Sequence, residues 1–358
     1  MNALGQRIAA LIAAQGPMSI AEFMTIALHD REAGYYATRD PLGVAGDFIT
    51  APEISQMFGE LIGLWLAQVW QDQGRPKNPR LVELGPGRGT LLADALRALK
   101  LVPEFLRALD VVLVEVSPVL RTLQEKSLSN CGVPVRWVPE FRTIAHDRPF
   151  YLIANEFFDA LPIQQYVKTE RGWCERMVSV DRSGELAFAL SPPLPEWSLP
   201  IAQNRAGAPN GSVYEFSKAG VSLAEDIGHF VEDVGGAAII IDYGYDVPGF
   251  SETLQAVASH KFADVLSAPG SSDLSAHVDF SALRIAARQG GAAVYGPIGQ
   301  GEFLTALGIA QRAERLSRAD PQKIAAEVNR LTNVDQMGTL FKALAIVPKF
   351  APTPPGFG

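Results

Sequence analysis

A strand, a glycine loop and a helix follow one another at residues 81–101, and this run restricts the fold more than any other part of the chain. Residues 81–84 read as a short strand, and Gly85, Gly87 and Gly89 follow at every second position. Residues 91–101 are rich in Ala and Leu and have a helical pattern. Glycines let a ligand approach the backbone closely, and a helix N-terminus offers unpaired N–H groups. The run therefore predicts an α/β fold with a nucleotide-type cofactor site.

The glycine spacing separates three kinds of cofactor. A dinucleotide site has G-x-G-x-x-G, whereas the third glycine here comes one residue early and Thr90 follows it. A P-loop ends in Lys-Ser or Lys-Thr, and neither pair is present. Glu83 can take the positive ammonium of an amino-acid moiety, and an acidic residue before G-x-G-x-G is typical of S-adenosylmethionine (SAM) methyltransferases. The residues expected to bind SAM here are Glu83, Gly85, Pro86, Gly87 and Gly89.

Apolar runs alternate with helical stretches from residue 80 onward. The early runs lie at 81–84, 111–114, 133–138 and 150–153, and a later one lies at 237–241. This alternation predicts a parallel sheet with helices on both faces. Segments 292–296 and 341–347 are candidates for a final antiparallel strand pair.

Other patterns interrupt or flank this sheet. Helical spacing appears at 3–14 and 19–30, and Ser19 with Glu22 three residues later predicts a capping box at the start of the second stretch. A single strong helix is expected from Glu53 to about Trp70. Short runs separated by turn residues predict an antiparallel β insertion. The expected organisation is an N-terminal helical region with a lid loop (1–75), a SAM-binding half (76–162), an inserted β and irregular segment (163–216) and a second half with added helices (217–358).

Two further strand ends carry candidate cofactor contacts. Glu115 ends the run 111–114, where a carboxylate can accept hydrogen bonds from both ribose hydroxyls. At the end of the run 133–138, Glu140 is a candidate for the adenine edge, and Phe141 or Trp137 for stacking on the ring. The alternative for Phe141 and Trp137 is an ordinary place in the core.

The segment Asn155 to Pro162 follows the fourth run, where the ligand crevice of an open sheet lies. Glu156 and Asp159 place two carboxylates beside aromatic rings, which suits a guanidinium. Asn155 can orient a substrate nitrogen. Alternatively, Glu156 caps a helix, and Phe157 and Phe158 belong to the core. In the glycine- and aromatic-containing loop before residue 53, Asp47 and Thr50 are either part of a lid over the cofactor or, for Thr50, a helix N-cap.

Composition excludes several classes of protein. The net charge of −8 and the pI near 5.3 argue against non-specific nucleic-acid binding. The chain has no apolar run of 18 residues, so no transmembrane helix is expected. The only cysteines, Cys131 and Cys174, are not spaced as zinc ligands, and no metal is expected. We expect a cytoplasmic protein, and a homodimer is left open.

The combined motifs resemble the MidA family of SAM-dependent methyltransferases, which includes mitochondrial complex I assembly methyltransferases. The resemblance covers nearly the whole chain. Its most specific blocks are Gly46-Asp47-Phe48-Ile49-Thr50 and Asn155-Glu156-Phe157-Phe158-Asp159-Ala160-Leu161-Pro162. It implies a seven-stranded, Rossmann-like class I methyltransferase sheet. It also implies a protein substrate, for which the 49-kDa-type subunit of complex I is the candidate, with symmetric dimethylation of an arginine that Glu156 and Asp159 would hold.

Two other functions stay open at this point. One is a small-molecule O-, C- or N-methyltransferase, which would share the cofactor half but not the acceptor. The other is a non-catalytic complex I assembly factor that binds SAM as a structural ligand.

Overall fold

The computed structural model describes residues 1–38, 49–200, 207–258 and 260–358, and the chain divides into two compact units. The first unit contains Met1–Phe48, Asp159–Val221 and Val247–Asp279. The second contains Ile49–Phe158, Ser222–Asp246 and Phe280–Gly358. This grouping differs from the four consecutive segments expected from the sequence, because the chain passes between the units several times.

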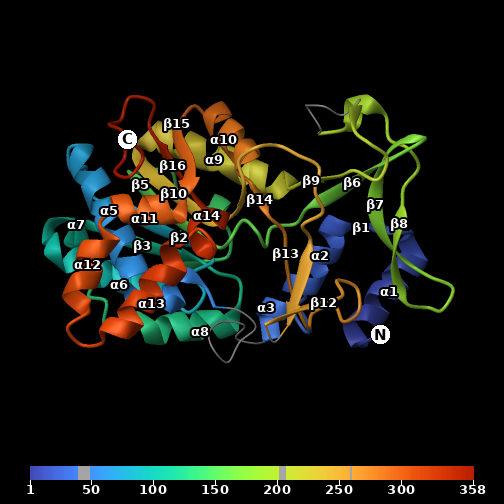
Figure 1. Cartoon of the computed structure of the whole chain (residues 1–358), viewed down its shortest axis with the longest axis horizontal. Helices are drawn as coiled ribbons and strands as arrows, with labels where there is room; N and C mark the ends of the chain where they lie inside the picture. The colour runs from blue at the N-terminus through green and yellow to red at the C-terminus, as the bar shows by residue number, and fades with distance from the viewer. Residues whose placement is uncertain (39–48, 201–206, 259) are drawn as a thin grey trace. The chain divides into compact units, whose positions relative to one another are not determined.

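A mixed sheet forms the centre of the second unit (Figure 1). Its path runs β15 (Ala293–Gly299), β16 (Phe341–Val347), β10 (Gly236–Tyr245), β5 (Phe150–Asn155), β2 (Arg80–Leu84), β3 (Asp110–Val114) and β4 (Val135–Val138). Neighbours from β10 to β4 are parallel, whereas β16 is antiparallel to both β10 and β15. The α/β class and the final antiparallel pair are confirmed, while the exact strand count stays a prediction.

Helices cover both faces of this sheet. Successive residues of a strand point to opposite faces, so each strand packs against both layers of helices. Tyr151 and Ile153 pack in one core cluster with α5 (Gln56–Asp72) and α6 (Thr90–Ala98). Phe150 points to the opposite face, where its ring centroid lies 5.6 Å from that of Phe230 on α9 (Lys218–Val234). The sheet is therefore buried on both sides, which explains its continuous apolar runs.

The chain reverses its strand order between β2 and β5. These two strands are neighbours, yet β3 and β4 extend the sheet in one direction and β10 and β16 in the other. Ligands of open α/β sheets bind at such a switch point, beyond the carboxyl ends of the strands. The glycine loop after β2 and the segment after β5 both begin at this edge.

The expected single helix from Glu53 to Trp70 is wrong in one detail. The structure has α4 (Ala51–Ile54) and then α5, because Ser55 is extended, with φ −155° and ψ 137°. The Ser55 hydroxyl accepts a hydrogen bond from the Met57 N–H and so begins a new helix. Apolar periodicity continues across the break and therefore concealed it.

The first unit combines the N-terminal helices with the inserted strands. Ser19 caps α2 (Ile20–His29) with the expected capping box to Glu22. The two-residue β1 (Met18–Ser19) pairs antiparallel with β7 (Gly172–Val180), so the N-terminal region shares a sheet with the insertion. That sheet also contains β6 (Gln164–Thr169), β8 (Leu186–Leu190) and β9 (Val213–Phe216), and the expected antiparallel insertion is confirmed.

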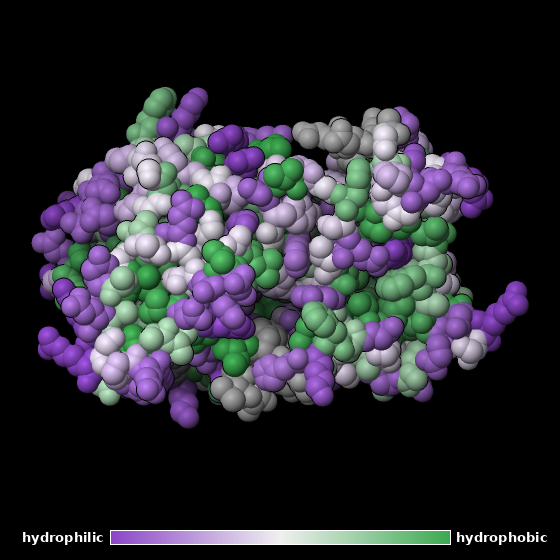
Figure 2. Space-filling view, viewed as in Figure 1, coloured by the Kyte–Doolittle hydropathy of each residue, from purple (hydrophilic) through white to green (hydrophobic). Residues whose placement is uncertain are grey.

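The remaining elements complete the two units. The first unit also has α1 (Ala3–Gln15), α3 (Tyr35–Thr38), η3 (Glu196–Ser198), β11 (Gln255–Ala258), β12 (Lys261–Ala263), β13 (Asp273–Ser275) and β14 (Val278–Asp279). The second has η1 (Leu99–Leu101), α7 (Pro103–Ala108), α8 (Pro118–Ser127), η2 (Phe141–Thr143), α10 (Phe280–Gln289), α11 (Gln300–Ala306), α12 (Ile309–Leu316), α13 (Pro321–Thr332) and α14 (Met337–Leu340). Figure 2 shows hydrophilic residues gathered at the edge of the second unit around α7 and α12. Within the described ranges, no helix combines the length and hydropathy that crossing a bilayer would need.

Candidate active site

The glycine loop bends sharply between β2 and α6. Gly85, Gly87 and Gly89 have φ values of 55°, 55° and 78°, which side-chain-bearing residues rarely adopt. Gly89 is the N-cap of α6 and, as a glycine, has no side chain that could accept from the first N–H groups of the helix. The first N–H groups of α6 are therefore oriented toward the loop side, where they suit an anionic or polar ligand.

Glu83 supplies the strongest test of whether this site fits SAM. The residue is 3% exposed on β2, and among the described residues no group bonds to its Oε2. Burial raises the pKa of Glu83 from 4.5 to about 8. A buried carboxylate without a counter-charge is unfavourable unless a ligand supplies one. The ammonium of a methionine moiety has the required charge, so the residues present fit this cofactor.

Glu115, directly after β3, is held in place by backbone and side-chain donors. Its Oε1 accepts from the Ser117 N–H at 2.7 Å, and its Oε2 accepts from Gln124 Nε2 at 2.9 Å. Burial raises the pKa of Glu115, although these hydrogen bonds favour its ionised form. Each carboxylate oxygen keeps a second lone pair, which can accept a ribose hydroxyl. Gln124 was not found from the sequence, since a glutamine in a helix gives no pattern.

The segment after β5 turns through an uncommon backbone conformation at Glu156. This residue has φ 49°, and its N–H donates to the Ile241 carbonyl at 2.8 Å. Glu156 Oε1 accepts from the Ala51 N–H at 2.9 Å and from Asn155 Nδ2 at 3.2 Å. Ala51 is the first residue of α4, so the alternative that Glu156 caps a helix describes one of its contacts. Non-glycine residues with positive φ cost energy and gather at functional sites.

The Asp242 carboxylate on β10 fixes this turn by hydrogen bonds to its backbone. Its Oδ2 accepts from the N–H groups of Phe157 at 3.1 Å and Phe158 at 3.0 Å. The Phe157 ring lies 2.7 Å from the position that a Cβ on Gly85 would occupy. The turn after β5 therefore packs directly on the glycine loop. In the sequence, Asp242 comes directly after the apolar run 237–241, as Glu115 does after 111–114, but its partners gave no sequence signal.

A short helix connects the two parts of this site. On α4, Glu53 Oε1 accepts from the Thr90 hydroxyl at 2.5 Å, and its Oε2 lies 3.7 Å from Arg88 Nη1. Thr50 is buried at the N-cap of α4, but its side chain makes no capping hydrogen bond. Its expected cofactor contact stays a prediction. Asp47 lies outside the described residues.

The residues expected near adenine have mixed surroundings. Glu140 is exposed. The Phe141 ring is buried, and its centroid lies 4.9 Å from that of Phe230 and 5.8 Å from that of Phe150. The adenine contacts expected of Phe141 and Glu140 stay predictions. Trp137 donates its indole N–H to Gln124 Oε1 at 2.8 Å.

Asp159 belongs to the first unit and is described there. Its side chain is buried, and its backbone carbonyl accepts from the Ala276 N–H at 3.0 Å. Within the second unit, the structure brings Asn155, Glu156 and the glycine loop together. The role of Asp159 stays a prediction.

Comparisons with known proteins agree with this geometry. Residues 61–298 match the family described as "Putative S-adenosyl-L-methionine-dependent methyltransferase". The chain belongs to this family. "Protein arginine methyltransferase NDUFAF7, mitochondrial" of Xenopus tropicalis is 37% identical over 97% of the chain and 86% of its own length. The protein of the same name from Bos taurus is 38% identical over 94% of the chain and 81% of its own length.

A solved structure of a family relative supports the cofactor. The crystal structure of a Burkholderia thailandensis protein with bound S-adenosyl-homocysteine superposes with a TM-score of 0.87 at 29% identity. The match covers 99% of this chain and 94% of that one. The chain is thus a SAM-dependent methyltransferase with the fold of its family, and SAM is its cofactor.

Proposed function

We propose that the chain is a protein arginine N-methyltransferase that forms symmetric dimethylarginine on a subunit of respiratory complex I. The observation that carries the proposal is the Glu156 carboxylate, fixed by Ala51 and Asn155 in a turn that packs on the cofactor loop. The relatives named protein arginine methyltransferases support the acceptor class. The complex I subunit rests on the resemblance of the motifs to the MidA family.

Glu156 is suited to a guanidinium because the acceptor stays positively charged at neutral pH. When bound, SAM supplies a methyl group on a positively charged sulfonium. The carboxylate would orient the guanidinium by charge-assisted hydrogen bonds and favour positive charge away from the attacking nitrogen. After transfer, Glu156 could accept the proton that the nitrogen loses. We assign Asp159 to the same acceptor as a second carboxylate, from its place three residues later in the chain.

A charge-removing variant tests the role of Glu156. Gln at position 156 keeps an oxygen that can accept from the Ala51 N–H, so the turn should be retained. We expect Glu156→Gln to lower methyl transfer by about 100-fold while S-adenosyl-homocysteine binds almost as tightly as to the wild type. The assay uses labelled SAM and lysate of a strain that lacks the protein. Glu104→Gln, on the surface of α7, is the matched control.

Two results would contradict this assignment. One is equal labelling by Glu156→Gln and wild type, and the other is labelling confined to small molecules. Peptide mapping of the 49-kDa-type subunit, with and without the enzyme, then identifies the modified residue. Detection of only asymmetric dimethylarginine would remove symmetric dimethylation from the proposal.

A cofactor-site variant separates catalysis from a purely structural role. Gly87 has φ 55°, which valine rarely adopts, so Gly87→Val should strain the loop and abolish SAM binding. If Gly87→Val restores complex I assembly as well as wild type, assembly requires neither bound SAM nor methyl transfer. Fractionation tests the expected cytoplasmic location, and sedimentation of the wild type tests whether it forms a homodimer.

A further inference from the structure

Gln124 on α8 contacts three separate parts of the site edge from a fully buried position. Its Nε2 donates to the Gly87 carbonyl at 2.7 Å and to Glu115 Oε2 at 2.9 Å. Its Oε1 accepts from the Trp137 indole N–H at 2.8 Å. These three partners follow or end β2, β3 and β4, which are adjacent parallel strands.

The chemistry of an amide fits these three partners. A glutamine has two N–H donors on one nitrogen, and here each reaches a different acceptor. The oxygen is used by the indole, so the orientation of the amide is determined by all three partners. A carboxylate of the same length has no donor at neutral pH and would place a like charge beside Glu115.

The local chain holds Gln124 at this point. Ser117 caps α8 by accepting from the Leu120 N–H, and the same residue donates its own N–H to Glu115. The helix therefore begins at the carboxylate that it later contacts through Gln124. In addition, a Cβ on Gly89 would lie 3.5 Å from the Cα of Gln124, so α8 is in contact with the glycine loop.

We propose that Gln124 is a positioning residue for SAM, which fixes the Glu115 carboxylate and the Gly87 carbonyl before the cofactor arrives. This inference rests on the proposed ribose contact of Glu115. Without the amide, the half-buried Gly87 carbonyl and Glu115 Oε2 lose their Gln124 donor, and Glu115 is held by backbone N–H groups alone. The energetic cost then appears in cofactor binding as well as in folding.

The test is calorimetric binding of S-adenosyl-homocysteine to the full chain. Gln124→Met keeps the length and volume of the side chain but removes all three hydrogen bonds. We expect its affinity to fall at least about tenfold. Gln300→Met is the matched control, because Gln300 is also fully buried in the second unit and its Nε2 donates to the Leu331 carbonyl. The control should lose stability but keep its affinity.

A pH series separates positioning from general loss of stability. In Gln124→Glu, the introduced carboxyl can donate to Glu115 only when it is protonated. The ratio of variant to wild-type affinity should therefore rise as the pH falls from about 8 to about 6. A structural role alone would not produce this recovery. This series also decides the question if Gln124→Met does not fold.

Glu115→Gln distinguishes failure of this inference from failure of the underlying assignment. If Glu115→Gln loses affinity but Gln124→Met binds within twofold of wild type, the positioning role of Gln124 is wrong and the ribose contact stands. If Glu115→Gln binds like wild type, the ribose contact itself is wrong. A flat affinity ratio for Gln124→Glu across the pH series would also overturn the inference.

Discussion

At the scale of single residues, Glu83 destabilises the free protein and is suited to bind the ammonium group of the cofactor. Its carboxyl is buried in the sheet, and burial raises its pKa to about 8. The free protein therefore holds Glu83 largely protonated at pH 7, whereas an ammonium ligand requires the ionised form. A residue that weakens the free fold in this way is typical of a site that awaits a charged ligand.

We expect cofactor binding to release about one proton near pH 7. The affinity for S-adenosyl-homocysteine should fall as the pH drops below about 8, because binding must then remove a proton from Glu83. Calorimetry in buffers of different ionisation enthalpy measures the released proton. The same heat in every buffer would show that Glu83 is not ionised on binding.

The variant Glu83→Gln provides the matching stability measurement. The raised pKa favours the neutral form in the fold, so the wild type gains stability below about pH 4.5 and loses it as the pH rises to about 8. Each pKa unit corresponds to about 1.4 kcal/mol, so the effect reaches at most a few kcal/mol. Glu83→Gln should bind cofactor weakly, yet exceed the wild type in unfolding free energy at pH 8 and approach it toward pH 4.5.

At the scale of elements, the packing of α5 on α6 determines where the glycine loop ends. A Cβ on Gly59 would lie 2.7 Å from the Leu91 carbonyl oxygen, and one on Gly63 would lie 2.7 Å from that of Ala95. Both distances are far below van der Waals contact. The two helices approach this closely only because glycine occupies both positions, and α6 starts immediately after Gly89.

Gly59→Ala and Gly63→Ala should therefore destabilise the protein, although alanine favours a helix by about 1 kcal/mol. We expect a loss of about 1–3 kcal/mol in unfolding free energy, measured with denaturant. Gly59→Ala should also weaken cofactor binding more than Gly63→Ala, since Leu91 lies in the first turn of α6. Gln68→Ala, exposed on the same helix, should stay within about 0.5 kcal/mol of wild type. Stabilisation by either alanine would contradict the close contact.

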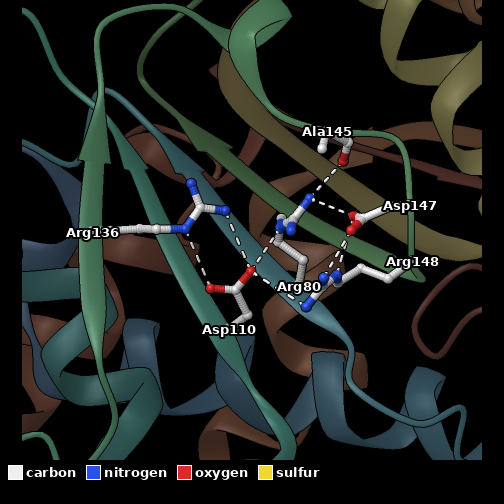
Figure 3. A network of polar contacts seen from close by, with 6 residues as sticks. All are labelled: Arg80, Asp110, Arg136, Ala145, Asp147 and Arg148. Atoms are coloured by element: carbon white, nitrogen blue, oxygen red, sulfur yellow. Dashed lines mark hydrogen bonds and ion pairs between the residues drawn. The ribbon is translucent and has the colours of Figure 1, made fainter.

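At the scale of the second unit as a whole, a network of charged side chains connects the N-terminal ends of the strands, whereas the site lies at their C-terminal ends. Arg80, at the start of β2, is buried and bonds to Asp110 at 2.9 Å and Asp147 at 3.1 Å (Figure 3). Arg136 reaches the same Asp110 from β4, at 3.3 Å. The side-chain hydrogen bond from Arg148 lowers the pKa of Asp147 to about 2. Binding and structural charges thus occupy opposite ends of the same strands.

This separation predicts opposite phenotypes for the two ends. Arg80→Met removes the buried partner of the half-buried Asp110 and should lower the unfolding free energy by about 2 kcal/mol, because hydrogen bonds to a charged group are lost. Cofactor affinity of the folded molecules should not change. Arg136→Met, at an exposed partner, should cost about 1 kcal/mol or less. Thermal unfolding with and without S-adenosyl-homocysteine measures the stability and the cofactor affinity of each variant. A loss of affinity in Arg80→Met would refute the separation of binding charges from structural charges.

The sequence determined the cofactor half of the molecule. The glycine spacing, Glu83 before it and the alternating runs predict a SAM-binding α/β sheet, because close backbone approach and strand burial depend on local residue types. The inserted antiparallel strands and the capping box at Ser19 were predicted for the same reason. Local patterns determine such features wherever the responsible residues are neighbours in the chain.

Only the tertiary structure decided which distant residues meet. Gln124 bonds to Gly87, 37 positions away, and Asp242 accepts from Phe157, 85 positions away. Nor could the sequence show that Glu156 bonds to the Ala51 N–H, or that the core holds the Phe141 ring. These partners are set by strand order and helix packing, and a polar residue in an ordinary helix or strand gives no periodic signal of them. The sequence of the glycine loop thus predicts the cofactor, and the tertiary structure brings together the distant side chains that hold the loop in its conformation.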